Sequence, residues 1–268
     1  MDAREALLSV EKIIREHGDS KALGSYFLEF GRRLEVLRLV ERWCARGASV
    51  VDLGAQPFIA SCALKAIGYD VTAVDVEPEP YMPIAERCGV KVVKRDLERE
   101  RLDIRGADCA VFTEVIEHIH YYVPHVLSEI NKSLKPGGYL ILTTPNIASL
   151  FRRLRLILGK QPIYRYHVRE YTMPEVLAML EGARFKPVES YYSAVNDLTY
   201  VDAEPEDYKR LRDYVGLLKL AIKKPTKLNL LRAAAYPLVK LVPSLRMLIV
   251  AVSQKHREPA PTAIERWG

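Results

Sequence analysis

One short block of the sequence brings carboxylate and imidazole side chains together. It reads Thr113-Glu114-Val115-Ile116-Glu117-His118 and leads from a predicted strand into a predicted helix. On a helix, Glu114, Glu117 and His118 lie at positions i, i+3 and i+4, and therefore share one face. His167 lies in the irregular segment YRYHVREYT, which we expect to fold over the same end of the protein. Side chains of these types can exchange protons with a substrate or bind a metal ion.

Three interpretations of this block stay open. In the first, His118 or His167 is a general base that Glu114 or Glu117 orients. In the second, the carboxylates and one or both histidines bind a divalent metal, because such cations accept mixed oxygen and nitrogen ligands. In the third, Glu114 lines a cofactor pocket, while Glu117 and His118 are structural residues at the start of a helix.

Three aspartates lie near the ends of successive strand-like runs. Asp52 lies in VVDLGA, which ends in Gly54-Ala55, Asp75 lies in TAVDVEP, and Asp96 lies in KRDL. In an open parallel sheet, ligands bind beyond the C-terminal strand ends, at the point where strand order reverses. Asp75 is placed to accept hydrogen bonds from ribose hydroxyls, and Asp96 to accept one from the exocyclic amine of a purine. The three positions together predict a nucleoside-bearing cofactor.

The elements that must position these residues alternate between strands and helices. Such alternation predicts βαβ units and a parallel sheet covered on both faces. We expect helices over 3–17 and 32–46, alternating strands and helices from 49 to 146, a basic helix over 148–159, a helix from Thr172 to about Leu180, a strand over 185–195, helices over 205–223 and 226–241, and a last strand over 246–253.

These blocks resemble the class I S-adenosylmethionine-dependent methyltransferases over roughly residues 45–253. The matching blocks are VVDLGA, TAVDVEP, KRDL, DCAVFTEVIEHI and LKPGGYLILTTPN. The resemblance implies an α/β fold, namely a Rossmann-like three-layer αβα sandwich. Its seven-stranded sheet is expected to be mainly parallel, with an antiparallel last strand, and we expect helical additions to this core. It also implies methyl transfer from S-adenosyl-L-methionine by in-line displacement, which we expect to be O-methylation of a small molecule, a sugar or a lipid-linked acceptor.

The resemblance also assigns the cofactor site. Asp52 and Gly54 are expected at the methionine moiety, Asp75 at the ribose and Asp96 at the adenine. The other expected cofactor-binding residues are Ala55, Gln56, Val76, Leu97, Thr113 and Glu114. The family usually has Gly-x-Gly-x-Gly after the first strand, whereas this chain has Gly54-Ala55-Gln56-Pro57-Phe58, in which Pro57 removes a backbone donor. A non-catalytic cofactor-binding protein on the same scaffold is therefore an alternative.

The EVIEH block also resembles the metal-dependent small-RNA 3′-end 2′-O-methyltransferases and the ubiquinone-pathway O-methyltransferases. The candidate catalytic residues are then His118, His167 and Glu117. The candidate ligands of a divalent metal are Glu114, Glu117, His118 and His167. An RNA ribose 2′-O-methyltransferase is an alternative function, but the chain lacks the additional RNA-binding domain that this function would want, so nucleic acid is the less favoured partner.

The net charge of +6 is concentrated in residues 151–169 and 205–246. Two basic segments predict an anionic partner, although solvated helix faces would give the same pattern. Within 226–241, Leu228, Leu231, Ala235 and Leu238 or Val239 form an apolar stripe, with Lys227, Arg232 and Lys240 elsewhere. A basic amphipathic helix of this kind packs on the domain, or makes peripheral membrane contact through 205–246.

Composition and organisation give the remaining expectations. With 49% hydrophobic and 28% charged residues, no long apolar run and a charged N-terminus, the chain is predicted to be a cytoplasmic globular protein. The four cysteines form no CxxC pair, which predicts buried free thiols. Few amide side chains and many charged ones indicate a thermophilic source.

We expect a helical cap over 1–47, a methyltransferase domain over 48–253 with a helical insertion at about 200–244, and a loose tail over 254–268. No oligomeric state is predicted.

Overall fold

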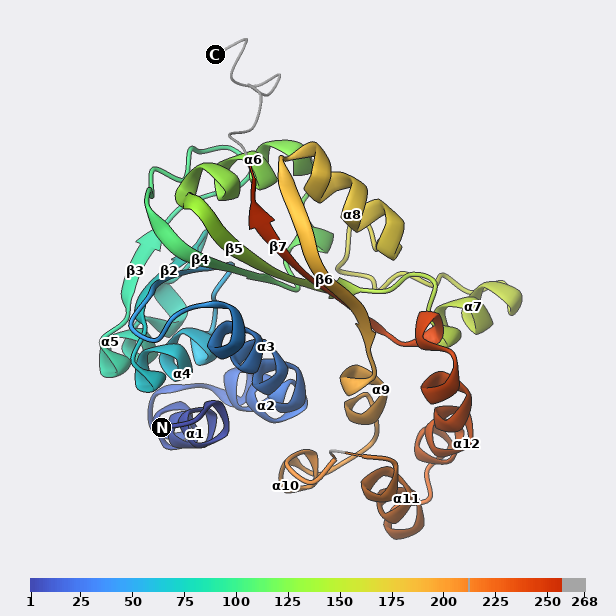
Figure 1. The fold of residues 1–268 in the computed structure, drawn as a ribbon. Helices are drawn as coiled ribbons and strands as arrows, with labels where there is room; N and C mark the ends of the chain where they lie inside the picture. Colours follow the sequence, from blue (N-terminus) through green and yellow to red (C-terminus); the bar gives the residue numbers. More distant parts are fainter. Residues whose placement is uncertain (212, 257–268) are drawn as a thin grey trace.

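The computed structural model describes residues 1–211 and 213–256. Its centre is a seven-stranded sheet in the order β3-β2-β1-β4-β5-β7-β6 (Figure 1). The strands are β1 (Ser49–Leu53), β2 (Asp70–Asp75), β3 (Lys91–Lys94), β4 (Ala107–Thr113), β5 (Leu134–Pro145), β6 (Phe185–Ser193) and β7 (Leu248–Lys255). Strand β7 runs antiparallel to both β5 and β6, whereas β1 to β5 pair in parallel. The predicted Rossmann-like sandwich with an antiparallel last strand is therefore confirmed.

Helices cover both faces of the sheet (Figure 1). One face packs against the N-terminal helices α1 (Ala3–His17), α2 (Ser20–Leu28) and α3 (Phe30–Trp43), together with α4 (Ile59–Ile67) and α5 (Met82–Cys88). The other face packs against α6 (Val123–Ser133) and α8 (Met173–Gly182). In β4, Val111 faces the first layer, and its neighbours Ala110 and Phe112 face the second. A central strand buried on both faces needs apolar residues at every position, which explains its unbroken apolar run.

A helical insertion between β6 and β7 and a short helix after β5 extend from the edge of the sheet (Figure 1). The insertion contains α9 (Val195–Thr199), α10 (Pro205–Tyr208), α11 (Tyr214–Lys223) and α12 (Lys227–Leu241), and the short helix is α7 (Leu150–Ile157). The single helix expected over 205–223 is wrong, because the chain forms α10 and α11 there. Helices α2 and α9 were not expected from the sequence. The insertion has a small core of its own, which includes Leu217, Leu220 and Tyr236.

Helix α12 buries only part of the apolar stripe that its sequence shows. Leu228, Leu231 and Leu238 are 41%, 49% and 46% exposed, whereas Val239 is 1% and Arg232 is 7% exposed. Asn229 is fully buried and donates to the carbonyl oxygens of residues 202 and 224. The helix thus packs on the domain through Asn229, Arg232, Ala233, Tyr236 and Val239, and peripheral membrane contact through its exposed leucines stays a prediction.

The C-terminal strand continues further than expected. The sequence predicts a loose tail from residue 254, but β7 extends to Lys255, and the rest of that tail, 257–268, lies outside the described residues. Over the ranges 1–211 and 213–256, no helix combines the length and the apolar character that a bilayer crossing requires.

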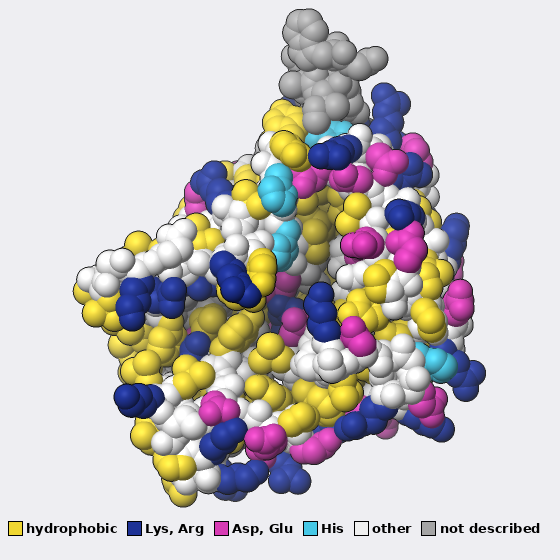
Figure 2. Space-filling model, turned by 180° about the vertical axis from the view of Figure 1, so that it is seen from behind, with side chains coloured by type: hydrophobic (Ala, Val, Ile, Leu, Met, Phe, Trp, Pro, Cys, Tyr) yellow, Lys and Arg dark blue, Asp and Glu magenta, His cyan; other side chains and the backbone are white. Residues whose placement is uncertain are grey.

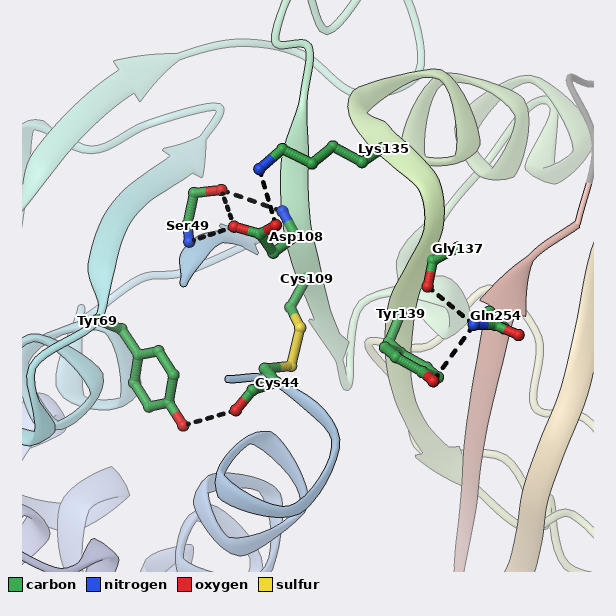
Figure 3. Close-up of a disulfide and its surroundings, with 9 residues drawn as sticks. All are labelled: Cys44, Ser49, Tyr69, Asp108, Cys109, Lys135, Gly137, Tyr139 and Gln254. Atoms are coloured by element: carbon green, nitrogen blue, oxygen red, sulfur yellow. Dashed lines mark hydrogen bonds and ion pairs between the residues drawn. A yellow bond between two sulfur atoms is a disulfide. The ribbon is translucent and has the colours of Figure 1, made fainter. Parts of the chain in front are cut away.

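The four cysteines form two disulfides, so the prediction of free thiols is wrong. Cys44, at the end of α3, pairs with Cys109 in β4 (Figure 3). Cys62 in α4 pairs with Cys88 at the end of α5. The spacing along the chain could not show this, because each pair meets only when helices pack on the sheet. Localisation in the cytoplasm stays a prediction, and it no longer has support from free thiols. Buried disulfides do occur inside hyperthermophilic cells.

A candidate active site at the strand ends

A cavity of about 990 Å³ opens where β1 and β4 end, between the N-terminal helices, α7 and the insertion. Figure 2 shows this face hollowed, with histidine, acidic and basic side chains gathered around the hollow. The lining includes these predicted site residues: Asp52, Gly54, Ala55, Gln56, Thr113, Glu114, Glu117, His118 and His167. Four further predicted residues lie outside the lining: Asp75, Val76, Asp96 and Leu97. Strands β1 and β4 are neighbours at which the sheet order reverses, so this is the place where such a fold binds ligands.

Asp52 in β1 is a buried carboxylate at the floor of this cavity. One of its oxygens accepts a hydrogen bond of 2.5 Å from the hydroxyl of Ser61 in α4. Burial raises the pKa of Asp52 to about 6, because the charged form is poorly solvated there. A cation in the cavity would stabilise the ionised carboxylate.

Gly54 occupies a position that no other residue fits without strain. Its φ is +68°, in the region that favours glycine, and its N–H donates to the carbonyl of Val74 at 2.8 Å. A β-carbon at this position would lie 2.4 Å from Cγ2 of Val115. The glycine therefore lets the loop after β4 close over the end of β1.

We expect Gly54→Ala to lower the free energy of unfolding by about 2–4 kcal/mol, the combined cost of positive φ and overpacking. Gly89→Ala is the matched control, since Gly89 has φ +65° and an added β-carbon there would meet no atom within 4 Å. Urea unfolding of both variants separates the two costs. If Gly54→Ala costs no more than Gly89→Ala, the contact with Val115 is not a constraint.

Asp75 ends β2 with its carboxylate held by the backbone. It accepts the N–H of Gln56 at 2.9 Å and that of Glu77 at 3.2 Å. The side chain of Gln56 in turn donates to the carbonyl of Glu77 at 2.6 Å, so the loops after β1 and β2 are tied together. Val76, next to Asp75, is 57% exposed at the surface. Asp75 can thus accept further hydrogen bonds from a ligand without losing its orientation.

Asp96 and Leu97 follow β3, two residues beyond its end. One oxygen of Asp96 accepts the N–H of Glu98 at 2.9 Å, and the other lies 3.7 Å from Arg99. Leu97 packs against the core on the α6 and α8 side of the sheet. Asp52, Asp75 and Asp96 therefore stand at the ends of three adjacent strands, but Asp96 is engaged in its own turn.

The segment after β4 does not form the helix that the spacing of Glu114, Glu117 and His118 predicts. Glu114 has φ +56°, and only Ile116–His118 form a single 3₁₀ turn. The N–H of Glu114 donates to the carbonyl of Thr143 in β5 at 2.9 Å, which turns the chain sharply at this point. The three side chains still line one cavity, because the turn rather than a helix face brings them together.

Glu114 is engaged in a buried ion pair that the sequence did not reveal. Arg32 of α3 lies 2.6 Å from an oxygen of Glu114 and 2.6 Å from an oxygen of Glu29. Burial opposes the charge of Arg32, but the two carboxylates raise its pKa. Burial also raises the pKa of Glu114, while Arg32 acts against this shift. Its carboxylate is paired with Arg32. Through this ion pair, Glu114 connects helix α3 to the segment that follows β4.

Glu117 differs from Glu114, because one of its oxygens has no donor. Its Oε2 accepts the hydroxyl of Thr144 at 2.9 Å, whereas Oε1 is buried without a hydrogen-bond partner in the part of the chain that the structure describes. Glu117 is 1% exposed, and burial, followed by the charge of Glu114, raises its pKa well above the ordinary value. A buried acceptor without a donor is costly, and such an atom suits contact with a cation or with a ligand that donates a hydrogen bond.

The two histidines each use Nδ1 in a contact with the protein. Nδ1 of His118 lies 3.1 Å from the carbonyl oxygen of Tyr166, and Nδ1 of His167 lies 2.8 Å from a carboxylate oxygen of Glu170. Both partners only accept, so we assign a proton to each Nδ1; in that tautomer Nε2 carries the lone pair that a ligand needs. Burial and the neighbouring His167 lower the pKa of His118, which keeps that ring neutral.

Glu117, His118 and His167 together form a candidate metal-binding group. Their ligand atoms all lie within 4.8 Å of one another, and the two imidazole rings pack edge to face at 4.8 Å. Glu170, which orients His167, also pairs with Arg152 at 2.5 Å. Hydrogen bonding of the far nitrogen to a carbonyl or a carboxylate is typical of histidines that bind metals. Of the four predicted ligands, the structure brings these three together and places Glu114 with Arg32.

Several cavity residues were missed by sequence reasoning. They are Ser25, Glu29, Arg32 and Arg33 of the N-terminal helices, Arg152 of α7, and Tyr200 and Arg232 of the insertion. One signal could have indicated Arg32, because it lies one turn before Val36 on the apolar side of α3. A charged residue at a buried helical position needs a partner, and that partner is usually part of a site.

Comparisons with known proteins find relatives of this chain. A family model described as a methyltransferase domain matches residues 27–190. The mitochondrial ubiquinone biosynthesis O-methyltransferase of Schizosaccharomyces pombe is 26% identical over 178 residues, which are 64% of this chain and 63% of that protein. A probable S-adenosylmethionine-dependent methyltransferase of Mycolicibacterium smegmatis is 32% identical over 165 residues, which are 58% of each chain. The chain thus spans less than two thirds of the length of these curated relatives.

Solved structures with low sequence identity share the fold. The 1,6-didemethyltoxoflavin-N1-methyltransferase of Burkholderia thailandensis, with bound 1,6-didemethyltoxoflavin and S-adenosylhomocysteine, has a TM-score of 0.53 and 17% identity. The match covers 94% of this chain and 89% of that chain. At this identity the likeness extends to the arrangement of the sheet and its helices.

Proposed function

The chain belongs to the methyltransferase family, and from this premise we propose that it transfers a methyl group from S-adenosyl-L-methionine to an acceptor hydroxyl. The family model covers residues 27–190, which include every predicted cofactor-binding residue. When bound, the cofactor supplies an electrophilic methyl group on a sulfonium centre. The protein then has to hold the acceptor oxygen in line with that methyl group and exclude water.

The side chains at the strand ends are complementary to this cofactor. The buried carboxylate of Asp52 suits an ammonium group, and the oriented carboxylate of Asp75 suits ribose hydroxyls. Arg33 of α3, held by Glu29 at 2.6 Å, lines the same cavity and suits a carboxylate. These three charges match the amino, ribose and carboxylate groups of S-adenosyl-L-methionine, which supports retention of cofactor binding despite the altered glycine loop.

Acceptor activation is assigned to Glu117, His118 and His167, which we propose bind a divalent cation. The observation that carries this assignment is the buried Oε1 of Glu117, which has no donor among the described residues and lies beside two imidazoles. A cation there would supply Lewis acidity that lowers the pKa of an acceptor hydroxyl. The side chains would fix the position of that hydroxyl at the end of β4.

The acceptor is proposed to be a small molecule or the head group of a lipid-linked one. The N-terminal helices, α7 and the insertion all line the cavity, which favours a compact acceptor over an RNA duplex end. An O-methyltransferase among the relatives agrees with a hydroxyl acceptor.

Calorimetry and a turnover assay test this function together. The protein is expected to bind S-adenosylhomocysteine, and Asp75→Ala is expected to weaken that binding at least about tenfold through loss of two charge-assisted hydrogen bonds. After chelator treatment, S-adenosylhomocysteine release from S-adenosylmethionine and catechol-type acceptors should require added Mg²⁺, Mn²⁺ or Zn²⁺. Full turnover without added metal would contradict the proposal that a cation activates the acceptor, and it would favour a histidine as general base. A folded protein that does not bind S-adenosylhomocysteine would contradict the proposed function.

A further inference from the structure

Arg232 of α12 is a cavity residue with no role in the chemistry described above. We propose that its guanidinium binds an oxyanion, a carboxylate or a phosphate, carried by the methyl acceptor. Calling that ligand the acceptor rests on the proposed function, whereas the anion site itself rests on the geometry around Arg232.

The first support is the orientation of α12. Arg232 lines the same cavity as Glu117, His118 and His167, and it is 7% exposed. Elsewhere on the helix, Leu231 and Leu238 remain 49% and 46% exposed. The packed face of α12 also buries Tyr236 and Val239, so Arg232 stands in the cavity wall among apolar side chains. An arginine is rarely buried unless it has a partner, so its pairing has to be accounted for.

The second support is the incomplete pairing of the guanidinium. Nη1 lies 3.0 Å from the thioether sulfur of Met247, which is a weak acceptor. Nε is buried and has no partner among the residues that the structure describes. The nearest carboxylate, Asp197, lies 3.8 Å away, which is too far for a hydrogen bond. Burial lowers the pKa of Arg232 to about 10, while the charge of Asp197 acts against this shift.

The third support is that the guanidinium plane is held in place. It lies over the ring of Phe151 in α7, 3.7 Å from the centroid. The adjacent Arg152 is paired with Glu170, and Arg232 forms an ion pair with Asp197 but keeps a buried Nε that has no partner among the described residues. A fixed guanidinium presents its N–H donors in a planar fork, which matches the two oxygens of a carboxylate or a phosphate.

The mouth of the cavity suggests where the rest of the acceptor lies. Leu154, Ile157 and Leu158 of the α7 segment and Leu231 of α12 line the mouth and are 37–79% exposed; we call these four residues the apolar rim. Figure 2 shows hydrophobic and basic side chains on this lobe beside the hollow. An oxyanion at Arg232 can therefore belong to a soluble acceptor or to one with an apolar chain on the rim.

Calorimetric titration of the protein saturated with S-adenosylhomocysteine tests the proposal. The probes are 3,4-dihydroxybenzoate, its neutral amide 3,4-dihydroxybenzamide, inorganic phosphate and monomeric dodecyl phosphate. We expect the benzoate to bind at least about tenfold more tightly than the amide, as a charge-assisted hydrogen bond allows. Phosphate should compete with the benzoate. Tighter binding of dodecyl phosphate than of phosphate assigns a lipid-linked source, and equal binding assigns a soluble one.

Three variants give the contrast. Arg232→Gln is expected to abolish the preference for the benzoate over the amide, and Arg232→Lys to retain part of it, because lysine keeps the charge beside Asp197 but loses the planar fork. Lys240→Gln, an exposed residue on the same helix, should change nothing. Thermal melting of Arg232→Lys within a few degrees of the parent shows that the fold is kept.

Two outcomes overturn the proposal, and neither depends on turnover. One is equal binding of benzoate and amide, or no binding of any anionic probe at millimolar concentration, in the parent protein. The other is a preference for the benzoate that survives in Arg232→Gln. If anions bind through Arg232 but S-adenosylhomocysteine does not bind, the proposed function fails and the anion site stands. If S-adenosylhomocysteine binds and the benzoate preference is absent, the anion site fails and the proposed function stands.

Discussion

The Glu117→Gln enzyme is expected to transfer methyl groups about 10²–10⁴-fold more slowly than the parent, the range that loss of a group handling a proton or a metal-bound oxygen produces. The amide oxygen can still accept the hydroxyl of Thr144, so the fold around β5 is kept. What disappears is the carboxyl group that a bound cation would hold ionised beside His118 and His167. Affinity for divalent cations should fall in parallel with the rate.

Steady-state kinetics, calorimetry with S-adenosylhomocysteine and metal titration by calorimetry check this expectation. Cofactor affinity should stay near the parent value, because Glu117 lies apart from the ends of β1 and β2. Glu189→Gln, in β6 and paired with Arg42, is a control carboxylate outside the cavity. A Glu117→Gln enzyme with parental turnover and metal affinity would remove this residue from the chemistry.

Glu114 and Glu117 illustrate how two carboxylates three residues apart take different roles. Glu114 faces Arg32 at 2.6 Å, whereas Oε1 of Glu117 is buried without a partner among the described residues, in a side chain grouped with the two histidines. Removing one partner of a buried ion pair leaves the other charge unpaired, which typically costs about 3–5 kcal/mol. A substitution at Glu114 therefore acts first on the attachment of the N-terminal helices, and one at Glu117 acts first on the chemistry.

The sequence was sufficient to predict the sheet, because strand and helix periodicities are local. The ends of β1, β2 and β3 bring Asp52, Asp75 and Asp96 to one edge through a rule that holds for every parallel sheet. The helix expected at Glu114 was wrong, since a positive φ at a glutamate depends on the contact with Thr143 rather than on propensity. Local pattern could not supply that contact.

The residues that sequence reasoning missed come from elements attached to the sheet. Arg32 reaches the site from α3, and Arg232 reaches it from a helix inserted between β6 and β7. The apolar stripe of α12 left its packing open, and the structure buries Val239 of that stripe together with Asn229 and Arg232, while three of its leucines stay exposed. Hydrophobic periodicity predicts which helices bury an apolar face. It fails where polar residues of a site occupy buried positions of a helix.

The disulfide between Cys44 and Cys109 is expected to contribute about 4 kcal/mol to the free energy of unfolding, because it closes a long loop of 65 residues. Cys44→Ala/Cys109→Ala should lose this amount in urea unfolding. Cys62→Ala/Cys88→Ala, which opens a loop of 26 residues, should lose about 0.8 kcal/mol less by the same loop-entropy relation. Alkylation with mass spectrometry verifies the pairing before and after treatment with a reductant.

This crosslink also acts on the site, because it joins the two elements that bear the Arg32–Glu114 pair. Cys44 ends the helix α3 that carries Arg32, and Cys109 lies in β4, which leads directly into Glu114 (Figure 3). The nearby Ser49–Asp108–Lys135 hydrogen bonds hold the start of β1 and β4 without the sulfur bridge. We therefore expect the Cys44→Ala/Cys109→Ala protein to stay folded at low temperature and to bind S-adenosylhomocysteine more weakly, while Cys62→Ala/Cys88→Ala keeps parental affinity. Equal affinities of the two variants for S-adenosylhomocysteine would show that the Cys44–Cys109 disulfide stabilises the fold without affecting the site.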